Sequence, residues 1–269
     1  MTQLAADGRA ATATYVFAVC RDADPAVLAH LPGLAPQAPV RSLACGTLTA
    51  IVQHVDAADF SDDVWQQRLS DRHELERCAR AHHDVVCAAA TCGPTVPLPL
   101  ATMYRSDSRA RQAVTEEADR FHAALERVAR HQEWGVKVYA PTVTTEADDS
   151  PRPTAPAGRV PPAPGAGLAY LNRRRDLQQR RERHREETLQ TAEAVDAELR
   201  TVATAARRLR LHSVELTAPR GTQVLNAAYL VATHRSDDFA RLVRTLGHRA
   251  GARIEVSGPW VPYSFVGEA

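Results

Sequence analysis

Proline and alanine dominate one stretch near the middle of the chain, and this stretch separates two parts that look like ordinary globular sequence. Between Ala140 and Gly167 the apolar periodicity is lost, and prolines stand at Pro151, Pro153, Pro156, Pro161, Pro162 and Pro164. Such a segment buries too little apolar surface to offset the entropy lost on ordering it, and its prolines favour extended backbone. We therefore expect an N-terminal domain over residues 1–140, a linker over 141–166 and a C-terminal domain over 167–269.

Each part is long enough to fold around its own hydrophobic core. The chain has 269 residues, of which 44% are apolar and 24% charged, and its formal net charge is +1. A nearly neutral chain has no global field that would attract nucleic acid or an anionic membrane. No segment reaches the roughly 20 apolar residues that cross a bilayer, and Met1–Thr14 lacks the apolar run of a signal peptide. The sequence therefore predicts a cytoplasmic protein.

The C-terminal part shows apolar patterns that alternate between strand and helix periods. We expect strands at Gly167–Asn172, Leu211–Thr217, Gln223–Thr233 and Arg253–Ser257, and helices at Arg173–Leu209 and Ser236–Ala250. The order βαββαβ is that of a ferredoxin-like domain, with a four-stranded antiparallel sheet and both helices on one face.

The N-terminal part predicts a second α+β domain with a looser version of the same order and an extra helix. Strands are expected at Tyr15–Val19, Val40–Ala44, Thr47–Val55 and Trp134–Tyr139, and long helices after Ser61 and Ser106. Gly46 lies between the second and third strands and suits a hairpin turn. The segment Thr95–Tyr104 holds Pro97 and Pro99, so we expect an edge strand or extended chain there.

No motif of a known catalytic or cofactor site occurs in the sequence. There is no Gly-x-Ser-x-Gly elbow, P-loop, Rossmann fingerprint or His-Glu-x-x-His. The adjacent His82 and His83 would point about 100° apart on a helix, and the residue four positions after His82 is Val86. We expect no catalytic residue, no cofactor and no metal site. The alternative is an enzyme on a ferredoxin-like scaffold that uses these histidines or a thiol.

An arginine-rich run from Arg173 to Glu187 opens the long helix expected in the C-terminal part. Apolar residues at helical spacing are scarce until Leu189, so this half of the helix is either solvated or reserved for a partner. Arginine can pair with carboxylates and lay its stem along apolar surface, which suits a protein partner. Nucleic acid is a third reading, weakened because no aromatic side chain is interleaved with the run. The candidate partner-binding residues here are Arg173, Arg174 and Arg181.

The C-terminal segment Gly258–Phe265 places three aromatic residues among two prolines. We expect it to lie as an extended ribbon, either over its own chain or against a partner, since proline interrupts regular strand pairing. Its candidate partner-binding residues are Trp260, Tyr263 and Phe265. The other two tryptophans, Trp65 and Trp134, are expected in the core.

Several blocks of the sequence form a pattern when they are taken in order. The blocks are Ala81–Val86, Val96–Leu98, Glu133–Val138, Ala169–Arg174, Leu225–Val231 and Gly258–Phe265. The most specific are Glu-Trp-Gly-Val-Lys-Val and the closing Gly-Pro-Trp-Val-Pro-Tyr-Ser-Phe. In this order the blocks resemble one family, the GvpF/GvpL gas vesicle proteins. One block departs from the family pattern: Pro97–Thr102 reads Pro-Leu-Pro-Leu-Ala-Thr where the family reads close to Pro-Leu-Arg-Phe-Gly-Thr.

The resemblance implies an accessory or minor structural protein that helps to form the gas-filled organelle, with no catalysis. The expected partners are the small, very hydrophobic shell protein GvpA and other gas vesicle accessory proteins, and the expected location is the cytoplasm or the vesicle itself. It implies that the chain limits aggregation of the shell protein, nucleates the shell or stays on its gas-facing surface. Nucleic acid and membrane are not expected partners. The F-type or L-type role and homo-oligomer formation are left open.

Overall fold

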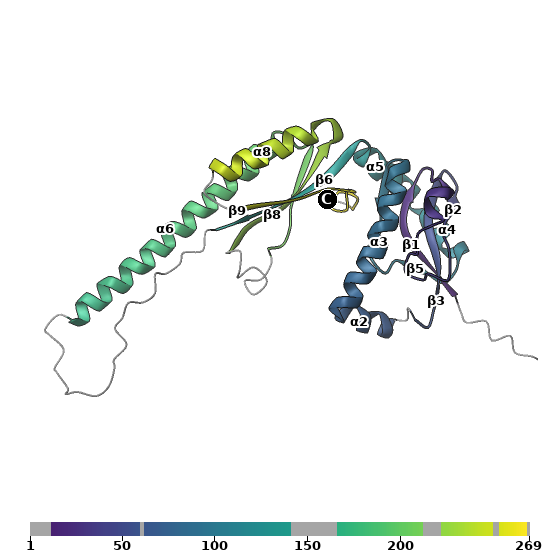
Figure 1. Cartoon of the computed structure of the whole chain (residues 1–269), viewed down its shortest axis with the longest axis horizontal. Coiled ribbons are helices and arrows are strands. Elements are labelled where there is room, and N and C mark those ends of the chain that lie inside the picture. Colours follow the sequence, from purple (N-terminus) through teal and green to yellow (C-terminus); the bar gives the residue numbers. More distant parts are fainter. Residues whose placement is uncertain (1–11, 60–61, 141–165, 212–221, 250–252, 268–269) are drawn as a thin grey trace, which may run out of the picture. The chain divides into compact units, whose positions relative to one another are not determined.

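The computed structural model describes residues 12–59, 62–140, 166–211, 222–249 and 253–267 (Figure 1). These residues form two compact units. The first contains the chain up to Glu133 together with the C-terminal segment from Gly258, and the second contains Trp134–Ser257. The expected linker, residues 141–166, lies outside the described residues except for Ala166, which begins a helix.

The first unit is built on an antiparallel sheet with its longest pairing between the first and third strands. The strands are β1 (Thr12–Cys20), β2 (Val40–Cys45), β3 (Leu48–Asp56), β4 (Thr95–Pro97) and β5 (Met103–Tyr104). Their order is β2-β3-β1-β4, and β5 also pairs with β1. The expected hairpin is confirmed, with Gly46 at a φ of 68° between β2 and β3. The segment with Pro97 and Pro99 is an edge of the sheet, as predicted.

Both faces of this sheet are covered, which is why β1 is buried along most of its length. Tyr15 and Phe17 pack in a cluster with residues of α1 (Pro25–Leu28), α2 (Asp62–Ser70) and α3 (Arg72–Cys92). Val16 and Val19 face the opposite cluster, formed with α4 (Asp107–Glu116) and α5 (Ala118–Val128). A strand buried on both faces reads as a continuous apolar run, and Tyr15–Val19 has that pattern.

Each of the two long helices expected in this unit is broken once. The first is interrupted at Asp71, whose Oδ1 accepts hydrogen bonds from the backbone N–H groups of His73 (2.8 Å) and Glu74 (3.4 Å) and so caps α3. The second is interrupted at Glu117, between α4 and α5. An aspartate at such a position satisfies the free N–H groups of the first helical turn, so it begins a new helix.

The second unit holds a four-stranded sheet and two helices packed together. Its elements are β6 (His131–Tyr139), α6 (Ala166–Arg200), β7 (Ala205–Arg208), β8 (Gln223–Ala232), α8 (Ser236–Arg249) and β9 (Arg253–Trp260). The strand order is β7-β8-β6-β9. Trp134 and Val136 of β6, Leu199 of α6 and Phe239 of α8 meet in one buried cluster, so both helices cover the same face. Trp65 and Trp134 are both buried, as predicted.

Several expectations for this half are wrong. Gly167–Asn172 is not a strand but part of α6, because a short apolar run reads equally as strand or helix. The strand predicted at Trp134–Tyr139 in the N-terminal domain extends over His131–Tyr139 and pairs instead in the second sheet. The long helix ends at Arg200 rather than Leu209, and the next strand is Ala205–Arg208 rather than Leu211–Thr217, of which 212–217 lie outside the described residues.

The last strand and the segment that follows it also differ from expectation. β9 continues through Pro259 to Trp260, beyond the expected end at Ser257, and Pro259 is tolerated because β9 is an edge strand. The chain from Gly258 onward belongs to the first unit, not to the C-terminal domain in which the sequence placed it.

Candidate functional site

The C-terminal segment is anchored on the first unit through its last aromatic residue and a pair of polar contacts. The side chain of Phe265 is buried, and its carbonyl oxygen accepts a hydrogen bond from Arg127 Nη1 of α5 (3.1 Å). The carboxylate of Glu133 accepts hydrogen bonds from the backbone N–H of Ser264 (2.7 Å) and from its hydroxyl (2.6 Å). The sequence left two arrangements open for this segment, over its own chain or against a partner. Phe265 packs on its own chain.

The two other aromatic side chains of the segment keep much of their surface in solvent. Trp260 is 44% exposed and Tyr263 is 36% exposed. Both lie against His83 of α3, with ring centroids 5.4 Å and 6.0 Å from its imidazole. The Tyr263 hydroxyl is 3.2 Å from His83 Nδ1. Burial raises the pKa of Tyr263, so the phenol stays protonated. We call Trp260, Tyr263 and His83 the aromatic patch.

A thiol completes the surroundings of His83. Cys87 Sγ lies 3.3 Å from His83 Nε2, one helical turn away on α3. Burial and the nearby Asp84 carboxylate raise the pKa of Cys87, so the thiol is not activated as a thiolate. Residues four positions apart on a helix face the same side, so this contact could have been expected from the sequence. The geometry is a packed contact rather than a nucleophile with its base.

The five cysteines differ in exposure. Cys20, Cys45 and Cys78 are buried, as expected of small apolar residues, whereas Cys87 is half-buried and Cys92 exposed. Among the residues that the structure describes, no group of three His, Cys, Asp or Glu side chains is arranged to hold a metal ion.

The arginine-rich helix predicted from the sequence is the first half of α6. Figure 1 shows α6 running on past the strands of its sheet. The described side chains ahead of Thr188 are all exposed, Arg174 among them, and Thr188 is the first buried residue. Arg173 and Arg181 lie on this helix, but their side chains are outside the described part of the chain.

The second half of α6 is acidic, and its carboxylates are paired within the second unit. Asp196 is buried, and it accepts hydrogen bonds from Tyr229 (2.6 Å) and from Arg208 Nη2 (2.8 Å). Glu193 also pairs with Arg208, and Glu198 with Arg249 of α8 at 3.4 Å. Burial opposes ionisation of Asp196, but the hydrogen bonds outweigh it and hold its pKa below the ordinary value.

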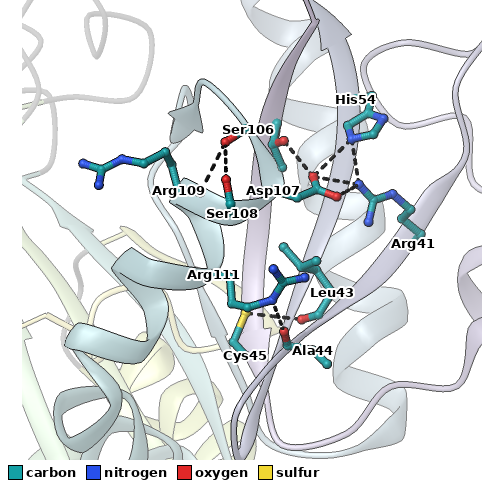
Figure 2. A network of polar contacts seen from close by, with 11 residues as sticks. Arg41, Leu43, Ala44, Cys45, His54, Ser106, Asp107, Ser108, Arg109 and Arg111 are labelled. Atoms are coloured by element: carbon teal, nitrogen blue, oxygen red, sulfur yellow. Dashed lines mark hydrogen bonds and ion pairs between the residues drawn. The ribbon is translucent and has the colours of Figure 1, made fainter.

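A separate polar network in the first unit joins α4 to three strands (Figure 2). Asp107, at the start of α4, receives hydrogen bonds from both strands that flank β3: from Thr14 of β1 (2.8 Å) and from Arg41 of β2 (2.6 and 2.8 Å). His54 Nε2 of β3 lies 3.1 Å from the same carboxylate. Burial would raise the pKa of Asp107, but these contacts lower it overall. The network fixes the helix on the sheet, and no local sequence pattern indicates it, because its members are far apart along the chain.

No helix of the described residues is long and apolar enough to cross a membrane.

Comparison with known proteins gives one consistent result. The profile of the family described as "Gas vesicle synthesis protein GvpL/GvpF" matches residues 13–267. Gas vesicle protein L of Streptomyces sp. (strain CB03234) is 36% identical over 256 residues, covering 95% of this chain and 93% of that protein.

Two solved structures share the fold. The crystal structure of GvpF from Anabaena sp. PCC7120 matches with a TM-score of 0.63 at 16% identity, covering 96% of this chain and 97% of the other. GvpF from Microcystis aeruginosa matches with a TM-score of 0.63 at 14% identity, covering 95% and 99%.

Proposed function

Because this chain belongs to the GvpL/GvpF family of gas vesicle synthesis proteins, we propose that it is a non-catalytic assembly protein that binds the main shell protein, GvpA. It binds the shell protein before incorporation and so lowers the concentration of free, aggregation-prone monomer. The effect is mass action, because a ligand that captures one state shifts the equilibrium toward that state. No step of this mechanism needs bond chemistry.

The observation that carries the proposal is the aromatic patch. A flexible tail that carried aromatic residues would lose much entropy on binding, but here Phe265 and Ser264 anchor the segment while Trp260 and Tyr263 remain exposed. Aromatic side chains held in place in this way are typical of the residues that dominate binding energy at interfaces. We assign the apolar contact with the shell protein to Trp260 and Tyr263, with Phe265 as their anchor.

The arginine-rich half of α6 supplies a second, charged contact in this proposal. Arg173, Arg174 and Arg181 would pair with carboxylates at the rim of the interface, where such pairs steer association and set specificity. The rest of the second unit is proposed to be a ferredoxin-like domain. Its element order βαββαβ, its strand order and its two helices on one face support that assignment.

Co-expression with the shell protein tests the proposal. We expect shell protein to stay in the soluble fraction and to co-purify with the chain, and we expect a Trp260→Ala, Tyr263→Ala double variant to recover much less. Leu75→Ala removes an exposed apolar side chain elsewhere on α3 and serves as the matched control. If the double variant and the wild type recover equal amounts of shell protein, the aromatic patch is not the binding site. If the wild type recovers no shell protein, the proposal itself is wrong.

Two versions of the role, a soluble chaperone and a permanent shell component, differ in one measurement. A permanent component is retained in isolated vesicles after washing, whereas a chaperone is lost. Immunodetection of the chain in washed vesicles separates the two.

A further inference from the structure

The buried stripe of α6 changes character halfway along the helix. In the second half Ala192, Val195 and Leu199 are buried, at steps of three and four residues. The same steps continued toward the N-terminus reach Thr188, which is still buried, and then Arg185, Gln178, Arg174 and Leu171, all of them exposed; Arg181 falls on the same line, but its side chain is outside the described part. Steps of three and four define one side of a helix, so the seam that packs in the core continues as an uncovered, mostly cationic seam. Leu171, at 59% exposure, is the first residue of this seam whose side chain the structure describes.

The arginine-rich half of α6 carries a high density of positive charge. The stretch 173–185 contains only Asp176 and Glu182 as acidic residues among its many arginines. These arginines lie beyond the first turn of α6, in which the helix dipole acts, so the dipole neither favours nor opposes them.

The two halves of α6 also differ in how their charges are satisfied. Glu193, Asp196 and Glu198 in the second half pair with arginines of the second unit. In the first half, within the described part of the chain, Arg174, Arg175, Arg180, Arg183 and Arg185 form no ion pair. These exposed guanidinium groups can therefore accept carboxylates of a partner without breaking an ion pair among the described residues.

We propose that the exposed half of α6 binds an acidic amphipathic helix of a partner protein. The bound helix places carboxylates opposite Arg174 and Arg185 and an apolar side chain against Leu171, so that the seam buried in the second half of α6 is continued. Helices paired in this way use charged residues beside an apolar seam to set register and choice of partner. This inference rests on the proposed function, because it names the kind of segment that a vesicle partner presents to this site.

The charge pattern favours a protein over a nucleic acid. Asp176, Glu182, Glu186 and Glu187 are distributed among the arginines, and their carboxylates repel a continuous row of phosphates. No aromatic side chain stands between Leu171 and Glu187 on which a base could stack. A partner helix can place its own basic residues opposite these carboxylates.

The test is direct binding of labelled peptides to the full chain, followed by fluorescence anisotropy at physiological salt. The probe is an alanine-based helical peptide with glutamates at steps of three and four and a leucine near one end. A scrambled peptide of the same composition and a single-stranded DNA of the same charge are the comparison probes. We expect the patterned peptide to bind best and to lose at least about tenfold in affinity when Arg174 and Arg185 are both changed to alanine.

The matched control is the double variant Arg72→Ala, Arg244→Ala, which removes the same charge from exposed positions on α3 and α8. It should bind the patterned peptide as the wild type does. Equal binding of patterned and scrambled peptides, equal losses in the two double variants, or tighter binding of the DNA would each overturn the inference. If the shell protein still co-purifies while the peptide does not bind, only this inference fails. If the peptide binds and the shell protein does not co-purify, only the proposed function fails.

Discussion

The buried histidine of α3 makes the stability of the first unit depend on pH below about 6.5. His82 is 4% exposed, and its Nδ1 lies 2.9 Å from the Tyr15 hydroxyl in the core between α3 and β1. Burial lowers the pKa of His82 from 6.5 to about 4, because the charged imidazolium loses its hydration. The native state therefore holds a neutral imidazole at pH values at which the unfolded chain is protonated.

The sign and size of the effect follow from this difference in pKa. Between about pH 6.5 and pH 4 the unfolded state binds more protons than the native state, so stability is lost as the pH falls through this window. Each pKa unit is worth about 1.4 kcal/mol, so the full effect is about 3 kcal/mol, of which about 2 kcal/mol is lost by pH 5. Well above pH 6.5 the imidazole of His82 is neutral in both the native and the unfolded state, so burying it costs no stability through protonation.

Urea denaturation of the wild type and of His82→Gln at pH 7.5 and pH 5 measures this contribution. Fluorescence of Trp65, measured in a Trp134→Phe, Trp260→Phe background, follows the transition of the first unit. The variant is expected to be less stable at pH 7.5 but to lose about 2 kcal/mol less than the wild type on going to pH 5. His73→Gln, at an exposed position of the same helix, should keep the wild-type dependence. Identical losses in His82→Gln and the wild type would refute the reasoning.

Four further outcomes are expected. Asp107→Ala should lower the free energy of unfolding by about 1–3 kcal/mol in urea denaturation, as the donors of Thr14 and Arg41 lose their acceptor; an unchanged midpoint would contradict the network. Asp196→Ala should cost about as much, by leaving Tyr229 without its acceptor, and Glu193→Ala, at an exposed pair, should cost under about 1 kcal/mol. Phe265→Ala should release the C-terminal segment, seen as faster amide exchange at Ser264, whereas protection kept in full would show that Phe265 is not the anchor. In thiol labelling at pH 7.5, Cys87 should react more slowly than exposed Cys92; the reverse order would support the enzyme alternative.

Local patterns were enough to predict most elements of the fold but not which sheet each strand joins. The segment Trp134–Tyr139 alternates as a half-buried strand should, and it is one. Nothing within it says that its neighbours in the sheet are β8 and β9, which come more than eighty residues later. The proline-rich stretch suggested a boundary after this strand, whereas the compact unit already begins at Trp134. Composition shows where a folded region ends. Pairing between distant strands decides to which folded unit a strand belongs.

The run Gly167–Asn172 shows the limit of short apolar patterns. Leu168, Ala169, Tyr170 and Leu171 suit a buried strand by composition, but α6 already includes them. The arginines that follow are good helix formers and continue the helix in both directions. The βαββαβ order was nevertheless predicted for this half, because Gly167–Asn172 was assigned as its first strand while the true first strand, predicted at Trp134–Tyr139, was placed in the other domain.

The candidate site was predictable in part. Its aromatic residues and arginines stand out in the sequence, because three aromatics among prolines and a dense arginine run are rare in a core. The anchoring of Ser264 by Glu133 joins residues 131 positions apart, and no local pattern indicates it. The contact between His83 and Cys87 follows from helical spacing alone and could have been expected.

Sedimentation of purified shell protein tests the central claim most directly. Shell protein is mixed with increasing amounts of this chain, without nucleotide, and the fraction left in the supernatant after ultracentrifugation is measured. If this chain binds the shell protein, this fraction rises in proportion to the added chain and saturates at a fixed stoichiometry. The two proteins then elute as one complex. Shell protein that sediments equally with and without the chain would contradict the account.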